Sequence, residues 1–361
     1  MAPRPTLTRI EAFCEAYDLL VPILLAPMAG ACPVSLSVAV ANAGGLGACG
    51  ALVMQPSAIQ EWADEFRAQS AGSFQVNLWI PDPPPRRDAV AELAVREFLS
   101  GWGVTVAPEA GDVPPLDFEA QCDAMLDIRP RVISSIMGLY PPSMVDRMNA
   151  AGIKWFATAT TVAEAKEAEH AGADAIVAQG MEAGGHRGAF DASRAERSLV
   201  GLFSLLPAVV DAVRVPVIAA GGIADARGIA AALLLGASSV VIGTGFLRCP
   251  EAKLQSAWAD AIGRTLPEDT LVTRAFSGRP GRTIATAYAR AATAPDAPPP
   301  APFPVQRGLT QAMRDAGIRG NDIDRIQAWA GQSAALAQPR PARDLVKNLW
   351  DGARELLNGP Q

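Results

Sequence analysis

Histidine and tyrosine are scarce in this chain of 361 residues, which has two histidines and three tyrosines. The five cysteines are an odd number, and no two of them form a Cys-x-x-Cys pair. This pattern argues against a disulfide framework and against a zinc site. We therefore expect no bound metal ion, and the cysteine content fits a reducing, cytoplasmic environment.

Long apolar runs and an excess of positive charge are also missing. No apolar run reaches the roughly 18 residues needed to span a bilayer, and residues 1–13 lack the continuous apolar segment of a signal peptide. The net charge of −6 argues against nucleic acid or an anionic membrane as a partner. Half of the residues are apolar and 19% are charged, which is the composition of a globular protein with a sizeable core.

Short apolar segments alternate with amphipathic or alanine-rich stretches over the first 262 residues. Several stretches end in a glycine, at Gly44, Gly152, Gly172 and Gly236, and glycine closes a helix by adopting a left-handed conformation. Strands that alternate with helices predict a parallel sheet with right-handed crossovers, and eight such units fit a (β/α)8 TIM barrel. The expected strands are Pro22–Leu25, Gly47–Leu52, Phe74–Leu78, Val132–Ile136, Lys154–Ala159, Ala175–Ala178, Val217–Ala219 and Ser239–Ile242. The expected helices include Ser57–Ala71, Pro142–Ala151, Thr161–Ala171 and Asp225–Leu235.

Two regions interrupt this alternation. Residues 81–116 contain two proline-rich stretches around one helical pattern, Asp88–Leu99, and exceed an ordinary connection between a strand and a helix. After residue 262, a Pro/Ala-rich tract, Ala294–Pro304, reads as an extended connector and precedes three helical patterns. We expect an α/β fold in which residues 1–80 and 117–262 form the barrel. Residues 81–116 and 263–361 are expected to form a smaller, mostly helical second domain over one mouth of it.

The segment 173–188 combines a buried strand with a glycine-rich loop. Its apolar run is followed by four glycines, a carboxylate, an arginine and His186. Glycines at the carboxyl end of a strand let the backbone approach a flat ligand closely. Histidine is the side chain whose unperturbed pKa lies near neutrality. The loop is therefore predicted to bind a ligand and to handle a proton or a charge.

The loops after the seventh and eighth expected strands suit a phosphate. Each contains glycines, in Gly221-Gly222 and in Gly243-Thr244-Gly245, whose backbone N–H groups can point at an anion. Barrels commonly hold phosphate after these two strands. Together with Ala26–Gly30 after the first strand and Asn77 in the third, the loops predict a phosphate-bearing cofactor at one mouth of the barrel.

Eight short motifs follow one another along the chain. In these motifs and their order, the chain resembles the bacterial nitronate monooxygenases, formerly called 2-nitropropane dioxygenases. EAGGHRG is the most specific segment. The resemblance implies non-covalently bound FMN on a barrel, and oxidation of alkyl nitronates such as propionate 3-nitronate by O2 to a carbonyl compound and nitrite. The motifs are Leu25–Gly30 (LAPMAG), Asn42–Gly47 (NAGGLG), Val76–Pro81 (VNLWIP), Ala178–Gly188 (AQGMEAGGHRG), Ala219–Ile223 (AAGGI), Ile242–Leu247 (IGTGFL), Phe276–Pro280 (FSGRP) and Trp329–Gln332 (WAGQ).

The resemblance also implies site residues by matching position. His186 is the implied catalytic residue beside the isoalloxazine. It can donate a hydrogen bond to the nitro oxygens, or take the α-proton of a neutral nitroalkane as a general base. The implied FMN contacts are Met28, Asn77, Gln179, Gly184, Gly221, Gly222, Val241, Ile242, Gly243 and Thr244.

The chain departs from the family pattern in two features, one at an implied cofactor contact and one at the substrate gate. Many relatives have glutamine where this chain has Val241; a backbone contact survives that change, whereas a side-chain contact does not. The tyrosine-rich substrate gate of some relatives is missing, because the tyrosines are Tyr17, Tyr140 and Tyr288.

Other functions remain open on the sequence alone. An FMN-dependent enoyl-acyl carrier protein reductase, or another NAD(P)H-dependent flavin reductase of the same barrel family, carries a similar EAGGH loop. Arg187 and the FSGRP and WAGQ segments favour the monooxygenase. A flavin carrier without catalysis would bind FMN and turn over no nitronate. The expected partners are a nitronate and O2, and the chain is expected to be a monomer or a homodimer.

Overall fold

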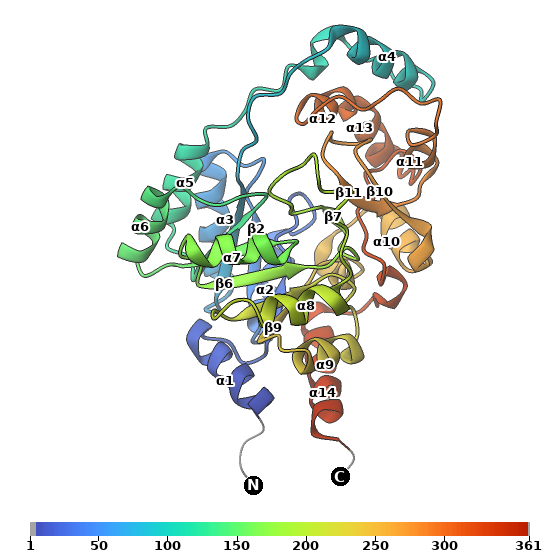
Figure 1. Cartoon of the computed structure of the whole chain (residues 1–361). Helices are drawn as coiled ribbons and strands as arrows, with labels where there is room; N and C mark the ends of the chain where they lie inside the picture. The colour runs from blue at the N-terminus through green and yellow to red at the C-terminus, as the bar shows by residue number, and fades with distance from the viewer. Residues whose placement is uncertain (1–4, 360–361) are drawn as a thin grey trace.

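An eight-stranded parallel sheet that nearly closes on itself lies at the centre of the computed structural model, which describes residues 5–359 (Figure 1). The strand order is β1-β9-β8-β6-β5-β4-β3-β2. A parallel bridge between Leu24 in β1 and Leu46, just before β2, brings the two edge strands together. The strands are β1 (Ile23–Leu25), β2 (Gly47–Gly50), β3 (Phe74–Trp79), β4 (Val132–Ile136), β5 (Lys154–Ala159), β6 (Ala175–Gln179), β8 (Val217–Ala220) and β9 (Ser239–Ile242).

The expected barrel is thus confirmed, and its strands lie close to the predicted ranges. The largest difference is at β2, which ends at Gly50 and not at Leu52. The side chains of these strands are almost all buried, because helices cover the outside of the sheet. The helices around it are α2 (Val34–Asn42), α3 (Pro56–Gln69), α5 (Phe118–Asp127), α6 (Pro142–Ala150), α7 (Val162–His170), α8 (Leu202–Val210) and α9 (Ala226–Leu234).

The predicted helix ends have a clear local cause. The four glycines expected to close helices, Gly44, Gly152, Gly172 and Gly236, all have positive φ angles, between 70° and 109°. At the other end of α7, the Thr161 side chain accepts from the backbone N–H of Glu164, and the Glu164 carboxylate accepts from the backbone N–H of Thr161. This reciprocal pair caps the helix start.

The last helix, α14 (Ala342–Asn358), belongs to the barrel layer. It packs between α9 and α2, which is the place of the eighth helix of a (β/α)8 barrel. Figure 1 shows α14 in red beside α9. Its buried residues lie along one face of the helix and join the main core; they include Ala342, Leu345, Val346, Leu349 and Ala353. The core of the barrel therefore includes side chains from the last part of the tail (residues 263–361), which is expected from the sequence to form part of a second domain.

The segment between β9 and α14 forms most of a smaller unit above the barrel mouth. Its elements are α10 (Ser256–Ile262), β10 (Thr270–Thr273), β11 (Gly281–Ile284), α11 (Ala287–Ala291), α12 (Val305–Leu309) and α13 (Gln311–Gly320). Strands β10 and β11 form an antiparallel sheet with β7 (Gly185–His186), which comes from the loop after β6. A mostly helical second domain is thus not confirmed, and the domain boundaries stay a prediction.

The segment inserted after β3, residues 81–116, packs on this smaller unit. It contains α4 (Ala89–Ser100), whose first turn is capped by the Asp88 carboxylate. Val95 and Leu99 of α4 share a buried apolar cluster with Phe276, Tyr288 and Leu309 from the tail. In Figure 1, α4 lies at the top, above α12 and α13. Of the helices in residues 5–359, none is long and apolar enough to cross a membrane.

Candidate active site

The residues implied for the cofactor lie at the carboxyl ends of β1, β3, β6, β8 and β9, on one mouth of the barrel. Direct contacts connect several of these loops. A Cβ atom at Gly243 would lie 3.3 Å from the sulfur of Met28, and a Cβ at Gly221 would lie 3.0 Å from the backbone nitrogen of Ala183. The structure therefore brings the loops after β1 and β9 together, and the loops after β6 and β8.

The backbone in two of these loops suits a phosphate group. Gly221 and Gly222 have φ angles of +103° and +70°, which side chains other than glycine rarely adopt. The backbone N–H groups of Gly222, Gly243 and Thr244 donate no hydrogen bond to any other residue among those described. Donors left free at glycine turns are what an anion needs. The residues present therefore fit the phosphate of a mononucleotide.

The N-terminus of α9, the helix after β8, is already capped by the protein, because the Asp225 carboxylate accepts from the backbone N–H of Gly228 at 3.0 Å. The same carboxylate pairs with Arg227. An anion would therefore bind the loop N–H groups and not the end of α9.

Three residues implied as cofactor contacts have side chains that bond or pack inside the protein: Gln179, Asn77 and Ile242. Gln179 donates to the carbonyl of His186 at 3.2 Å and accepts from the backbone N–H of Gly188 at 2.8 Å, so it closes the loop after β6. Asn77 donates to Ser134 in β4 at 3.0 Å. The Ile242 side chain is fully buried, whereas Val241 is partly exposed. The Ile242 side chain therefore offers nothing to a cofactor, and its carbonyl accepts from the backbone N–H of Ala26 at 3.0 Å.

His186 is held by the tail of the chain. Its backbone pairs with Gly281 in the β7–β11 ladder, and its Nε2 lies 2.7 Å from the Ser277 hydroxyl. The imidazole makes edge contacts with two indole rings, at centroid distances of 4.6 Å to Trp79 and 4.8 Å to Trp329. Burial lowers the pKa of His186 to about 3, with further lowering from Arg279 and Arg307. The ring is therefore neutral at physiological pH.

Arg187 stabilises the same loop through hydrogen bonds to its backbone. Its guanidinium is fully buried and donates to the backbone carbonyls of Gly180 at 2.6 Å and Gln179 at 3.2 Å, and no carboxylate among residues 5–359 forms an ion pair with it. Burial, followed by the charge of Arg282, lowers its pKa to about 10. Arg187 thus fixes the loop around His186 from inside.

The WAGQ segment, Trp329–Gln332, contacts the barrel loops through its backbone. The N–H of Gly331 donates to the Thr244 hydroxyl at 3.0 Å, and the N–H of Gln332 donates to the carbonyl of Glu182 at 2.9 Å. Thr244 and Gly184, both implied cofactor contacts, are therefore packed against the tail. The WAGQ segment and the glycine-rich loop after β6 lie far apart in the sequence, yet they are in contact at this site.

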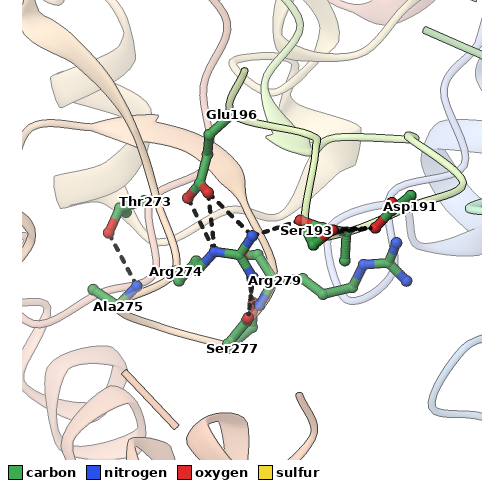
Figure 2. Close-up of polar contacts among 10 residues, drawn as sticks. Asp191, Ser193, Glu196, Thr273, Arg274, Ala275, Ser277 and Arg279 are labelled. Atoms are coloured by element: carbon green, nitrogen blue, oxygen red, sulfur yellow. Dashed lines mark hydrogen bonds and ion pairs between the residues drawn. The ribbon is translucent and has the colours of Figure 1, made fainter. Parts of the chain in front are cut away.

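A second set of contacts fastens the loop that follows His186. Figure 2 shows Arg274 reaching Glu196, with N–O distances of 3.0 to 3.2 Å, and Arg274 also donates to the carbonyl of Ala192. Arg279, almost fully buried, pairs with Asp82 of the insertion at 2.8 Å and donates to the carbonyl of Ala189. The insertion, the loop after β6 and the tail are thus joined at one place.

Several residues of the site were not singled out from the sequence. Trp79 lies two positions after Asn77 and so faces the same side of β3, a signal that the strand pattern contained. Phe303, in the tract interpreted as a connector, contacts Trp79 at a centroid distance of 5.3 Å. Arg307 carries no signal in the sequence, because its nearness to His186 depends on the fold of the tail.

Comparison with known proteins places this site in a family. The family model described as "Nitronate monooxygenase" matches residues 13–352. A relative named nitronate monooxygenase, from Paraburkholderia phytofirmans, is 36% identical over 338 residues, which cover 91% of this chain and 91% of that protein.

Solved structures agree with this assignment. The crystal structure of a nitroalkane oxidase from Streptomyces ansochromogenes has a TM-score of 0.87 and 33% identity, and covers 95% of this chain and 98% of its own. FabK from Thermotoga maritima has a TM-score of 0.73 and 27% identity, over 96% of this chain and 97% of its own. Since the family model spans most of the sequence and its signature loop surrounds His186, this chain belongs to the nitronate monooxygenase family.

Proposed function

We propose that this protein binds FMN and oxidises alkyl nitronates with O2 to a carbonyl compound and nitrite. The observation that carries the proposal is the place of His186. This histidine is neutral, is held by Ser277 and is flanked by two indole rings, and it lies at the same barrel mouth as the loops with free backbone N–H groups. Family membership supports a flavin enzyme, and the phosphate-suited loops favour a mononucleotide.

The bound flavin would accept electrons from the nitronate and pass them to O2, and the protein supplies the rest. The loops after β8 and β9 would hold the phosphate through the N–H groups of Gly222, Gly243 and Thr244. The indole rings of Trp79 and Trp329 limit the access of water to the His186 ring.

The charges near His186 suit an anionic substrate. Arg279 and Arg307 are close enough to disfavour a positive charge on the imidazole. The same positive field favours a nitronate, which carries a negative charge. His186 would remove the α-proton as a general base when the substrate is a neutral nitroalkane.

The likeness to the nitroalkane oxidase is stronger than the likeness to FabK in both TM-score and identity. We therefore favour nitronate oxidation over reduction by NAD(P)H. The choice is testable, because a reductase would oxidise NADH or NADPH in the absence of any nitronate.

The test is turnover by the purified protein. Flavin released on denaturation should have the mass of FMN, and nitroethane and its preformed nitronate should each give nitrite with consumption of O2. His186→Ala should keep FMN and lose about 10²- to 10⁴-fold in rate with nitroethane, the usual range for general acid–base catalysis, and lose less with the preformed nitronate. His170→Gln is the matched control, because His170 is exposed at the end of α7. A colourless protein that takes up no FMN, or no nitrite from either substrate, would refute the proposal.

A further inference from the structure

The hydroxyl group of Ser277 is fully buried and forms three hydrogen bonds that decide where its single proton lies. Its Oγ lies 2.7 Å from Nε2 of His186, donates to the carbonyl of Arg279 at 3.3 Å and accepts from the backbone N–H of Arg279 at 3.3 Å. Ser277 and Arg279 are adjacent in Figure 2. A serine hydroxyl has one proton to donate and two lone pairs to accept with.

Only one arrangement satisfies all of these groups. No other donor within residues 5–359 reaches the carbonyl of Arg279, so that carbonyl needs the proton of Ser277. The Ser277 oxygen then accepts from the Arg279 N–H and from Nε2–H of His186. The reverse direction would leave the buried carbonyl of Arg279 without a partner, which costs free energy.

The other ring nitrogen of His186 is left free. Nδ1 has no hydrogen-bond partner within the described chain, and it is not among the fully buried polar atoms. If Nε2 carries the proton, Nδ1 carries the lone pair and is open to a ligand. In a neutral imidazole, the bond made by one nitrogen sets the state of the other.

We propose that Ser277 is a positioning residue that holds His186 in its Nε2–H tautomer and so makes Nδ1 the base for neutral nitroalkanes. The inference rests on the proposed function. In the step, the α C–H bond of the nitroalkane breaks and the proton binds to Nδ1. The C–H electron pair forms the C=N bond of the nitronate, while the N=O π pair moves onto oxygen, which takes the negative charge. The Nε2–H bond to Ser277 persists throughout, so the ring keeps its orientation.

The proposal distinguishes two classes of substrate. A preformed nitronate has already lost its α-proton and does not need the lone pair of Nδ1. Loss of the Ser277 hydroxyl should therefore lower the turnover rate of the neutral nitroalkane and leave that of the nitronate nearly unchanged. If Ser277 had only a structural role, its loss would lower the two rates equally.

The tautomer can be measured directly, because the chain has only two histidines. In FMN-loaded protein with labelled histidine and the exposed His170 replaced by Gln, the ¹⁵N spectrum contains one imidazole. We expect a protonated Nε2 and an unprotonated Nδ1, and a mixture of tautomers in the additional variant Ser277→Ala. Ser277→Thr keeps the hydroxyl and should restore the single tautomer. A protonated Nδ1 in the parent protein would overturn the proposal.

Kinetics give an independent test. For Ser277→Ala we expect a loss of about tenfold in kcat/KM for nitroethane, which corresponds to one hydrogen bond, and less than about twofold for its nitronate. Ser277→Thr should recover most of the loss. The control Ser193→Ala removes an exposed serine that bonds Asp191 and should match the parent protein with both substrates. Equal losses for both substrates in Ser277→Ala would refute the positioning role.

The two proposals fail in different ways. If the parent protein turns over neither substrate, the proposed function is wrong, while the spectrum still tests the tautomer. If the parent protein turns over both and Ser277→Ala is unchanged with both, the function stands and the role of Ser277 is wrong.

Discussion

A Cβ atom on Gly184 would lie only 2.5 Å from the backbone nitrogen of Gly331. Gly184 belongs to the loop after β6, and Gly331 belongs to the tail, so the two segments touch backbone to backbone beside His186. The two backbones can approach this closely because Gly184 has no side chain. The approach fixes the tail against the barrel mouth at the point where the resemblance implies a cofactor contact.

Gly184→Ala should therefore destabilise the protein and weaken flavin binding, because the tail must move away from the loop. Overpacking of this kind costs about 1–3 kcal/mol in the free energy of unfolding. Gly320→Ala is the control, since a Cβ there has no neighbour within 4 Å and Gly320 lies in α13 without a positive φ. Thermal unfolding and flavin titration of both variants check the prediction. Equal behaviour of the two variants would contradict it.

Gly243→Val should weaken FMN binding. A Cβ at this position would lie 3.3 Å from Met28 and from Ala26, and a branched side chain would fill the space next to the free N–H groups of Gly243 and Thr244. We expect the dissociation constant for FMN, measured by quenching of flavin fluorescence, to rise at least about tenfold, the effect of roughly 1.4 kcal/mol. Unchanged affinity in a folded variant would show that the phosphate lies elsewhere.

The stability of the loop after His186 should depend more on the hydrogen bonds of Arg274 to backbone carbonyls than on its ion pair with Glu196. Glu196→Gln removes an exposed charge and should change the free energy of unfolding by less than about 1 kcal/mol. Arg274→Ala also removes bonds to the carbonyls of Ala192 and Gly278, so we expect a larger loss and faster hydrogen exchange over residues 189–200. Equal exchange in the two variants would contradict this order.

The pH dependence of stability should report on His186. Burial, with Arg279 and Arg307, lowers its pKa to about 3, whereas the unfolded chain titrates near the ordinary value of 6.5. The unfolded state therefore binds the proton more tightly, so this group makes the folded state less stable as the pH falls from about 6.5 toward 3.

Urea unfolding of flavin-free protein at pH 7 and pH 5 tests this dependence. The wild type should lose more stability over that range than His186→Gln, by up to about 1.4 kcal/mol for each pH unit below 6.5. Parallel pH profiles for the two proteins would show that the folded-state pKa is near its ordinary value.

The barrel could be predicted from the sequence because its signals are local. Apolar runs, glycine stops and caps such as Thr161 each depend on a few neighbouring residues. The place of α14 could not be predicted in this way. The apolar stripe of α14 shows that one face of the helix is buried, but nothing in residues 342–358 tells which surface covers that face. The smaller unit also separates α14 from the rest of the barrel in the sequence.

The site was predictable to the same extent. His186 and the glycine loops follow strands, so the rule that barrel sites lie at the carboxyl ends of strands finds them. The partners that hold His186 come from segments about 90 and 140 residues further along the chain, Ser277 and Trp329. Their motifs were visible, but the 2.7 Å contact with the imidazole depends on the β7–β11 pairing, which has too few residues to leave a strand pattern.

The tail also illustrates how the structure changes an experiment. Deleting residues 295–361 looks from the sequence like the removal of a lid. It would also remove α14, whose side chains Leu345 and Leu349 belong to the main core, and so uncover the surfaces of α9 and α2 on which this helix packs. Loss of activity in that truncation would therefore say little about the site, whereas single changes at Ser277 and Gly184 separate the site from the barrel.

The central claim is that this protein is a flavin enzyme that takes electrons from nitronates. The most direct test is the visible spectrum of the purified protein, mixed without oxygen with the preformed nitronate of nitroethane. We predict flavin absorbance that bleaches on mixing and returns when air is admitted, with nitrite released. A yellow protein whose spectrum does not change with the nitronate but bleaches with NADH would contradict the account.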